Sequence, residues 1–299
     1  MPTIKTKFDT LNQFNWHEKV TTYDESGAIS TALVINDNGT QSETYYVGGA
    51  VQQLLLVDGE GANSTGDWQQ TNKTFDPVTG LMISKQTIYD DGTQKLDIFL
   101  NGQLSQTRMS DSANAESWDS VITLYDTAGQ ISTRETINDD GTIKTQGYVG
   151  GNLIETIETD SAVDGGAEAW SIRSTTYASN GSVTGSHMVY DNADEFVFHY
   201  AEGKKDVKIE YDGDDSHGWL LKITDYDASG AVTGVSTYND AADVPAQYAE
   251  QLTQIDGLDF QPVIHIMPER ELPMLEPIEL IPLYEPELIP LLQDDSNWF

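Results

Sequence analysis

Cysteine is missing from this chain of 299 residues. Without thiols there are no disulfides, no cysteine-ligated metals and no cysteine nucleophiles. The sequence also has no apolar run approaching the length of a membrane helix and no amino-terminal segment with a basic end and an apolar middle. Neither a membrane span nor a cleavable signal is therefore predicted. These absences favour a bacterial protein secreted in one step, or a virion component, over a eukaryotic secreted protein.

Basic residues are few. The chain has 15 lysines and arginines against 49 aspartates and glutamates, which gives a formal net charge of −34. A field of this sign repels the phosphates of nucleic acids and anionic membranes. We therefore expect neither nucleic acid nor a membrane as a partner.

Motifs that mark catalytic sites are absent as well. The sequence has no Gly-x-Ser-x-Gly elbow, no phosphate-binding glycine loop and no His-Glu-x-x-His. Its five histidines do not stand at metal-ligand spacing, so we expect them to be packed or solvated. The carboxylates are too numerous to single out the acid pair of a glycosidase. We predict that the chain is not an enzyme, with a glycosidase as the least favoured alternative.

Repetition is what the chain has in abundance. Five tryptophans recur every 49 to 52 residues, and an aromatic residue follows each of them seven residues later. The tryptophans are Trp16, Trp68, Trp118, Trp170 and Trp219. Fixed spacing of this kind indicates one supersecondary unit copied in tandem. We expect these aromatic residues to form a core shared between units, although exposed rings could instead stack sugars.

Turn residues divide each unit. Asp24 opens and Gly27 closes the first turn of the first unit, and Asn36 to Gly39 reads Asn-Asp-Asn-Gly, a strong hairpin signal. The runs between the turns are rich in Thr, Val, Ile and Tyr, which favours strands. Each unit is therefore predicted to hold four antiparallel strands, and an acidic loop of variable length follows the fourth.

The variable loops favour a division into blades. The segment 3 to 9 has the pattern of a fourth strand, and the fifth unit is expected to keep three strands, with an echo of the fourth unit at Asp240 to Glu250. An amino-terminal strand that completes the last unit closes a propeller. We therefore predict an all-β domain at 1–257, as a five-bladed β-propeller in preference to an open hairpin array.

A proline-rich arm follows at 258–299. Seven of the ten prolines lie in its last 38 residues, and this spacing predicts an extended, polyproline-like chain. Apolar residues stand between the prolines, which marks a contact surface for a protein partner or a sister subunit. Folding back on the repeat domain and a role in export are the alternatives. The predicted contact residues are Leu272, Met274, Leu275, Ile278, Leu280, Ile281, Leu283, Tyr284, Leu288, Ile289, Leu291 and Leu292.

Clustered aspartates raise the question of calcium. Asp212, Asp214 and Asp215 place three hard oxygen donors in one loop. The loop does not match the calcium pattern of an EF-hand or of a β-roll. We expect most of these aspartates to cap turns and no cofactor to be required, and we keep Ca²⁺ at these three residues as the alternative.

The two hairpins from Ile122 to Gly141 resemble those of bacterial YD-repeat proteins, which also occur in large secreted proteins with calcium-binding repeat tails. The resemblance implies a non-catalytic module that is extracellular or belongs to a particle. We therefore expect a structural or interaction protein of a bacterial surface, secreted or virion assembly. A carbohydrate-binding, lectin-like propeller is the alternative function.

Overall fold

A computed structural model describes residues 1–59, 66–160 and 169–248. All of them belong to the first of two compact units, Met1–Leu258. The arm predicted at 258–299, with all its contact residues, lies outside the described residues. No helix in the described ranges has both the length and the apolar character needed to cross a bilayer.

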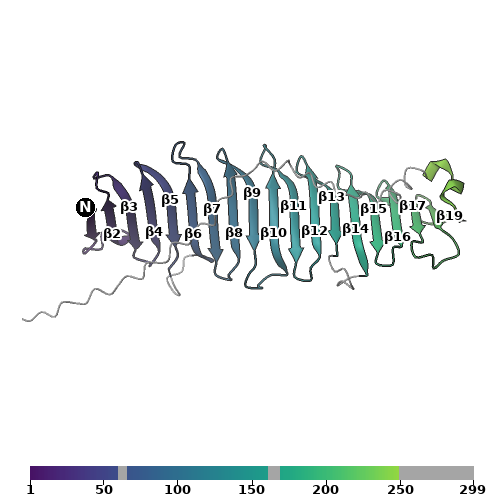
Figure 1. Cartoon of the computed structure of the whole chain (residues 1–299), viewed down its shortest axis with the longest axis horizontal. Helices are drawn as coiled ribbons and strands as arrows, with labels where there is room; N and C mark the ends of the chain where they lie inside the picture. Colours follow the sequence, from purple (N-terminus) through teal and green to yellow (C-terminus); the bar gives the residue numbers. More distant parts are fainter. Residues whose placement is uncertain (60–65, 161–168, 249–299) are drawn as a thin grey trace, which may run out of the picture. The chain divides into compact units, whose positions relative to one another are not determined.

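Nineteen strands make up the described fold (Figure 1). They are β1 (Thr3–Phe8), β2 (Trp16–Tyr23), β3 (Ile29–Asn36), β4 (Gln41–Val47), β5 (Ala50–Val57), β6 (Trp68–Phe75), β7 (Met82–Tyr89), β8 (Gln94–Leu100), β9 (Gln103–Ser110), β10 (Trp118–Tyr125), β11 (Ile131–Asn138), β12 (Ile143–Val149), β13 (Asn152–Thr159), β14 (Trp170–Tyr177), β15 (Val183–Tyr190), β16 (Glu195–Ala201), β17 (Lys204–Tyr211), β18 (Leu221–Tyr226) and β19 (Val232–Tyr238). Short 3-10 helices, Ala241–Asp243 and Ala246–Tyr248, follow β19.

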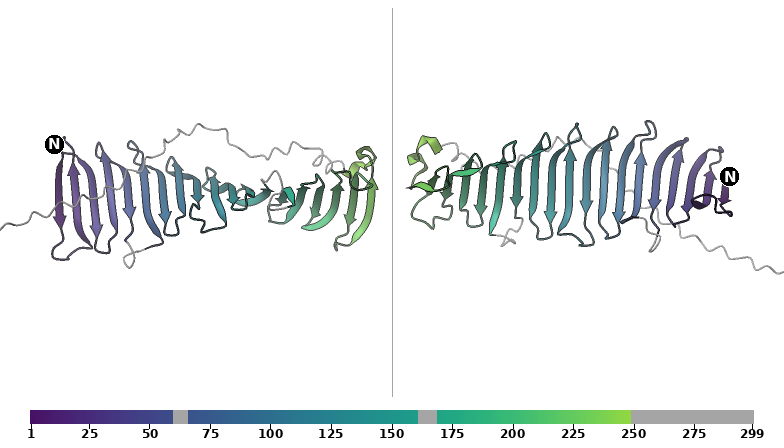
Figure 2. Two further views of the ribbon diagram at one scale, coloured as in Figure 1. Left: turned by 60° about the horizontal axis from the view of Figure 1, so that its bottom comes forward. Right: turned by 180° about the vertical axis from the view of Figure 1, so that it is seen from behind.

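Every strand pairs antiparallel with the next one along the chain, from β1 to β19, in a single sheet. Figure 2 shows these strands from two further sides, where they form one layer. The prediction of a closed five-bladed propeller is therefore wrong, and the open hairpin array is the architecture found.

The propeller prediction failed because it took the acidic loops for boundaries between blades. They connect strands that pair just as the tight hairpins do: β5 with β6, β9 with β10, β13 with β14 and β17 with β18. The loops therefore join consecutive strands of one sheet and do not separate blades. Likewise β1 pairs with β2 along its whole length, from Thr3 with Tyr23 to Phe8 with Glu18, and completes no distant unit.

The first turn of each unit shows why the register is so regular. In the first unit the amide of Asp24 donates to the carbonyl of Ala28 (2.8 Å), and the amide of Gly27 donates back to Asp24 (3.1 Å). Gly27 has a φ of 87°, a conformation that a side chain would strain. A bulge at Thr22/Tyr23 accompanies this turn and recurs at the corresponding turn of every later unit. Such bulges increase the local twist of the sheet.

The fifth unit differs from its predicted form. It has two strands, β18 and β19, and the expected third strand is replaced by the two 3-10 helices. Pro245 stands where the fourth unit has Phe196 in β16. Proline has no amide to donate to the ladder, so it stops a strand here. Its carbonyl instead accepts a hydrogen bond from the amide of Tyr248 (2.9 Å).

The apolar core is small and lies at the carboxyl-terminal end of the sheet. There Tyr248 packs on a cluster from β16, β17 and β18 that consists of Val197, Ile209, Leu221 and Ile223. Across the middle of the sheet, polar side chains take most of the buried positions, with Val121 and Ile157 as buried apolar residues between them. Thr107, for example, donates its hydroxyl to the buried Asp97 (2.7 Å). Cross-strand ladders of this kind hold much of the sheet together in place of a conventional core.

Candidate functional site

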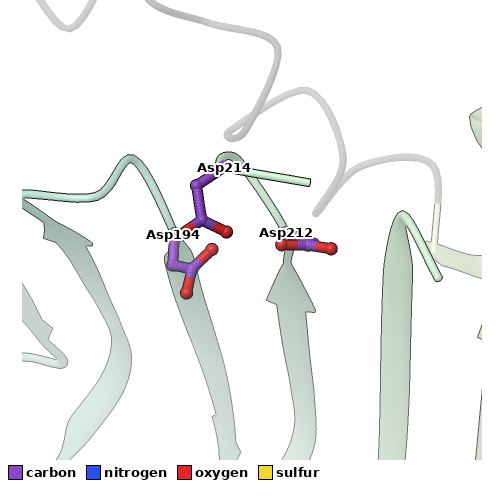
Figure 3. A group of neighbouring side chains, drawn as sticks. All are labelled: Asp194, Asp212 and Asp214. Atoms are coloured by element: carbon purple, nitrogen blue, oxygen red, sulfur yellow. The ribbon is translucent and has the colours of Figure 1, made fainter. Parts of the chain in front are cut away.

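Three aspartates meet at one end of β16 and β17 (Figure 3). One carboxylate oxygen from each of Asp194, Asp212 and Asp214 lies within 4.8 Å of the others. Asp194 immediately precedes β16, and Asp212 immediately follows β17 and is buried. Glu195 of β16 is paired with Tyr211 of β17. The hairpin register therefore brings Asp194 beside Asp212.

Protein donors already reach the carboxylates of this cluster. The amide of Ser216 donates to both Asp212 Oδ1 and Asp214 Oδ1 (each 3.0 Å), and the amide of His217 donates to Asp212 Oδ2 (2.7 Å). The side chain of Asn192 donates to Asp194 Oδ2 (2.9 Å) and Asp214 Oδ2 (3.1 Å). The remaining oxygen, Asp194 Oδ1, accepts from the amide of Gly213 (3.1 Å). All six oxygens thus accept at least one hydrogen bond.

These hydrogen bonds also affect the pKa of one carboxyl group of the cluster. Hydrogen bonds to its carboxylate, the largest from Ser216, hold the pKa of Asp214 below its usual value. The charged form is thus stabilised by the protein itself. The cluster has the oxygen ligands that calcium prefers, but its geometry is also that of a capped loop.

The structure brings together only two of the three aspartates that were predicted as metal ligands. Asp212 and Asp214 lie in the cluster, whereas Asp215 is not a member of it and occupies a left-handed backbone position with a φ of 58°. The sequence prediction missed Asp194. The signal was available in the repeat, because Asp194 stands where the first three units have Thr40, Thr93 and Thr142.

Asp212 belongs to a recurring set of loop caps. Asp9, Asp58 and Asp111 occupy the same place after the fourth strand of their units, and each accepts an amide from its own loop: Phe14 (2.7 Å), Gly66 (3.1 Å) and Glu116 (2.5 Å). Asp58, Asp111 and Asp212 are buried. Of the three aspartates that were expected to cap turns, Asp212 and Asp214 do accept amides of their own loop.

Three of the five repeat tryptophans have a cation of the chain itself over the ring, namely Trp16, Trp170 and Trp219. Lys19 lies over the ring of Trp16 (4.3 Å to the centroid), and Arg173 lies over the ring of Trp170 (4.5 Å). Phe14 also stacks on Trp16, with centroids 5.4 Å apart. Cations on the ring faces stabilise the rings in place and occupy the surface that a sugar would stack on.

Charged ladders cross the sheet beside two of these tryptophans. Glu158 of β13 contacts Lys144 of β12 (3.0 Å) and Arg173 of β14. Burial raises the pKa of Glu158, but the hydrogen bonds and charges of Arg173 and Lys144 outweigh it and lower the pKa overall.

A related arrangement recurs one unit later. Glu210 of β17 contacts Lys208 of the same strand (2.9 Å) and Lys222 of β18 (3.0 Å). A carboxylate between two cations is thus a repeated feature of this face of the sheet.

The four histidines among the described residues do not assemble into a site, and His265 lies outside those residues. His187 is buried, as expected for a packed residue, and its Nε2 lies 2.8 Å from Glu195 Oε2. His199 lies 3.5 Å from Asp206 and is exposed. The metal-capable cluster identified among the described residues contains no histidine.

Comparison with known proteins adds the following. No protein-family model matches the chain. No characterised protein sequence matches it either. Among solved structures, the chain is similar to the wild-type TCP10 domain of CPAP from Danio rerio, determined in complex with a peptide of Danio rerio STIL. The sequence identity is 11% and the TM-score is 0.39, over 79% of this chain and 99% of that domain.

Proposed function

We propose that this chain is a non-enzymatic structural or interaction protein of a bacterial surface, secreted or virion assembly. The observation that carries the proposal is the single-layer sheet. In the described part, its cluster of contacting buried apolar residues lies at one end, and most side chains of both faces are at least partly accessible. Such a sheet offers two long faces for contact with other molecules.

The use of the acidic residues supports a structural role. The carboxylates of the turns and loops hold backbone amides, as Asp24 does for Ser26 (2.8 Å) and Ala28 (3.0 Å). Others lie between cations, as Glu158 and Glu210 do. These described acids serve turns and cross-strand contacts, and this use supports a structural role.

We further propose that the arm at 258–299 attaches the protein to another subunit. The support comes from the sequence: apolar residues from Leu272 to Leu292 alternate with prolines that prevent a helix. An apolar stripe on an extended segment is typical of a contact site. A partner protein or a sister subunit fits this role.

A photo-crosslinking amino acid at Tyr284 tests the attachment. Under irradiation of the assembly, we expect a crosslink between position 284 and a different polypeptide. The same group at Val78, an exposed residue of the turn between β6 and β7, serves as the matched control and should give little product. A crosslink from position 284 only to residues 1–248 of the same chain would contradict the attachment.

The carbohydrate-binding alternative loses its basis. It required a propeller with exposed rings between blades, whereas the sheet is open and cations cover Trp16 and Trp170. We therefore do not propose a lectin or a glycosidase as a second function.

A further inference from the structure

The outer edge of β1 is open. The strand pairs with β2 on one side, and no described strand pairs with the other. All six residues of β1 are exposed, including Ile4 (66%) and Phe8 (62%). Leu11 and Phe14, in the loop that follows, are exposed as well.

The backbone groups of this edge can be assigned. The amide of Asp9 donates to the carbonyl of His17, across from β2 (3.0 Å). Because amides alternate in direction along a strand, those of Ile4, Thr6 and Phe8 point away from β2. The register of β1 with β2 has no bulge, and β1 contains no proline. Bulges and prolines keep an edge from pairing, and β1 has neither; its lysines, Lys5 and Lys7, are the charged residues that oppose pairing with a strand that is not acidic.

The charge of this edge is opposite to that of the chain. β1 carries Lys5 and Lys7 and no acid, and Lys7 lies directly opposite Lys19 of β2. Like charges in directly opposed positions destabilise a pair of strands. None of these three lysines has an ion-pair partner within 4.0 Å among the described residues. This basic patch stands in a chain of net charge −34.

The position of Lys7 can be compared with the equivalent position in the other units of the repeat. Lys7 precedes the loop cap Asp9 by two residues, as Glu158 precedes Asp160 and Glu210 precedes Asp212. In these two units the glutamate lies between two cations, whereas the first and second units have Leu56 and Met109 at this position. At β1 the position holds Lys7, and neither Lys7 nor Lys19 has a carboxylate within 4.0 Å among the described residues, so an added strand is free to supply one.

We propose that the outer edge of β1 binds an extended, acidic strand of another polypeptide, antiparallel to β1, as the next strand of the sheet. Main-chain hydrogen bonds to Ile4, Thr6 and Phe8 hold such a strand, and its acids face Lys5 and Lys7. The inference rests on the proposed function only in treating the chain as an interaction protein, since it uses β1 and not the arm.

A second copy of the chain is a poorer occupant. Antiparallel pairing of two β1 strands brings the lysines of one copy against those of the other. The opposite edge strand, β19, has the sequence Val-Thr-Gly-Val-Ser-Thr-Tyr and offers no acid. Charge complementarity therefore selects an acidic partner.

A strand of the chain itself provides the sequence for a test peptide. In the second unit, β8 pairs with β9 so that Lys95 faces Met109 and Asp97 faces Thr107, and these two β9 positions correspond to Lys7 and Lys5. A labelled peptide with the sequence of residues 94–100 and Lys95→Glu places acids opposite both lysines. A peptide with Lys95 retained and Asp97→Lys is the basic control. Fluorescence anisotropy with the full chain measures both dissociation constants, and we expect the acidic peptide to bind at least tenfold more tightly.

Variants of the full chain locate the site. Thr6→Pro removes an outward amide and leaves the bonds to β2, so it should weaken binding of the acidic peptide at least tenfold. Thr6→Val, which keeps the amide, should bind as the parent chain does. Lys5→Glu combined with Lys7→Glu should reverse the preference, so that the basic peptide binds better. Circular dichroism and urea midpoints show whether each variant is folded, and the charge reversal remains decisive if Thr6→Pro does not fold.

Several results would overturn the inference. These are no binding of either peptide, equal binding of both, or equal effects of Thr6→Pro and Thr6→Val. Sedimentation of the chain alone provides a further test, because a dimer that Thr6→Pro abolishes would make a second copy the occupant. Failure of the peptide test leaves the crosslink at Tyr284 unaffected, so the two proposals fail independently.

Discussion

At the scale of single residues, the carboxylates have three separate roles. They hold turns, as Asp24 and Asp227 do; they hold the acidic loops, as Asp111 and Asp212 do; and they balance cations across strands, as Glu210 does. Each role comes from a position in the repeat. Charge alone would not have distinguished them.

Replacing Asp227 by alanine should destabilise the protein. Its Oδ1 accepts the amide (2.8 Å) and the hydroxyl (2.6 Å) of Ser229 and the amide of Ala231 (3.0 Å). We expect a lower urea midpoint for Asp227→Ala and a smaller loss for Asp227→Asn, which keeps an acceptor. An unchanged midpoint for the alanine variant would contradict this role.

The same contacts predict acid sensitivity. Hydrogen bonds, first from the side chain of Ser26 or Ser229, lower the pKa of Asp24 and Asp227 from 3.8. A carboxyl group whose pKa is lower in the folded state stabilises the fold fully above its unfolded pKa and loses that contribution as the pH falls through the folded value. We therefore expect the urea midpoint to drop below about pH 4. The drop should be smaller in Asp227→Ala.

The side chain of Tyr45 should lose its proton at a higher pH than an ordinary tyrosine does. Burial, followed by the hydrogen bond and the charge of Glu43, raises the pKa of Tyr45 to about 12. Between pH 10 and 12 the unfolded chain loses this proton while the folded chain keeps it, so stability falls as the pH rises through this range. Absorbance at the tyrosinate band should show a transition near pH 12 that is absent from Tyr45→Phe.

Asp194 tests whether the cluster needs a cation. The first three units have threonine at this position, and Asp194→Thr removes one of three neighbouring negative charges. Because all the oxygens have protein donors, we expect the parent chain and the variant each to have the same midpoint in calcium and in chelator. A parent chain that is stabilised by calcium, and a variant that is not, would show a metal site instead.

At the scale of elements, the turn residues made the strands predictable from the sequence, but they did not determine which strands pair across the acidic loops. Asp24 and Gly27 specify a turn by themselves, so the hairpin within a unit follows from the sequence. Whether β5 pairs with β6 depends on an acidic loop whose length fits either a blade boundary or a continued sheet. Pro245 was a usable signal that the fifth unit would not form its third strand.

The small apolar core should be sensitive to truncation. Ile223 of β18 is fully buried against Ile209 and Tyr248. Ile223→Ala should therefore lower the free energy of unfolding by about 2–5 kcal/mol. Val232→Ala, at a residue that is 57% exposed, should change it by less than about 0.5 kcal/mol. Equal effects of the two substitutions would mean that this cluster is not the core.

At the scale of the whole described unit, each strand contacts mainly its sequence neighbours, so stability is close to a sum of local terms. This explains why the candidate site was predictable in part. Asp212 and Asp214 share a loop and were found together, but Asp194 reaches them only through the pairing of β16 with β17. The role of the arm stays a prediction.

The central claim is that the sheet is open, with β1 and β19 at opposite edges. Because the chain has no cysteine, cysteines introduced at Thr6 and Ser236 can carry a donor and an acceptor dye without further changes. Nineteen strands at about 4.8 Å spacing separate the edges by on the order of 80 Å, so the account predicts very low energy transfer between the dyes. Near-complete transfer in the folded, monomeric chain would mean that β1 and β19 are neighbours and that the sheet closes.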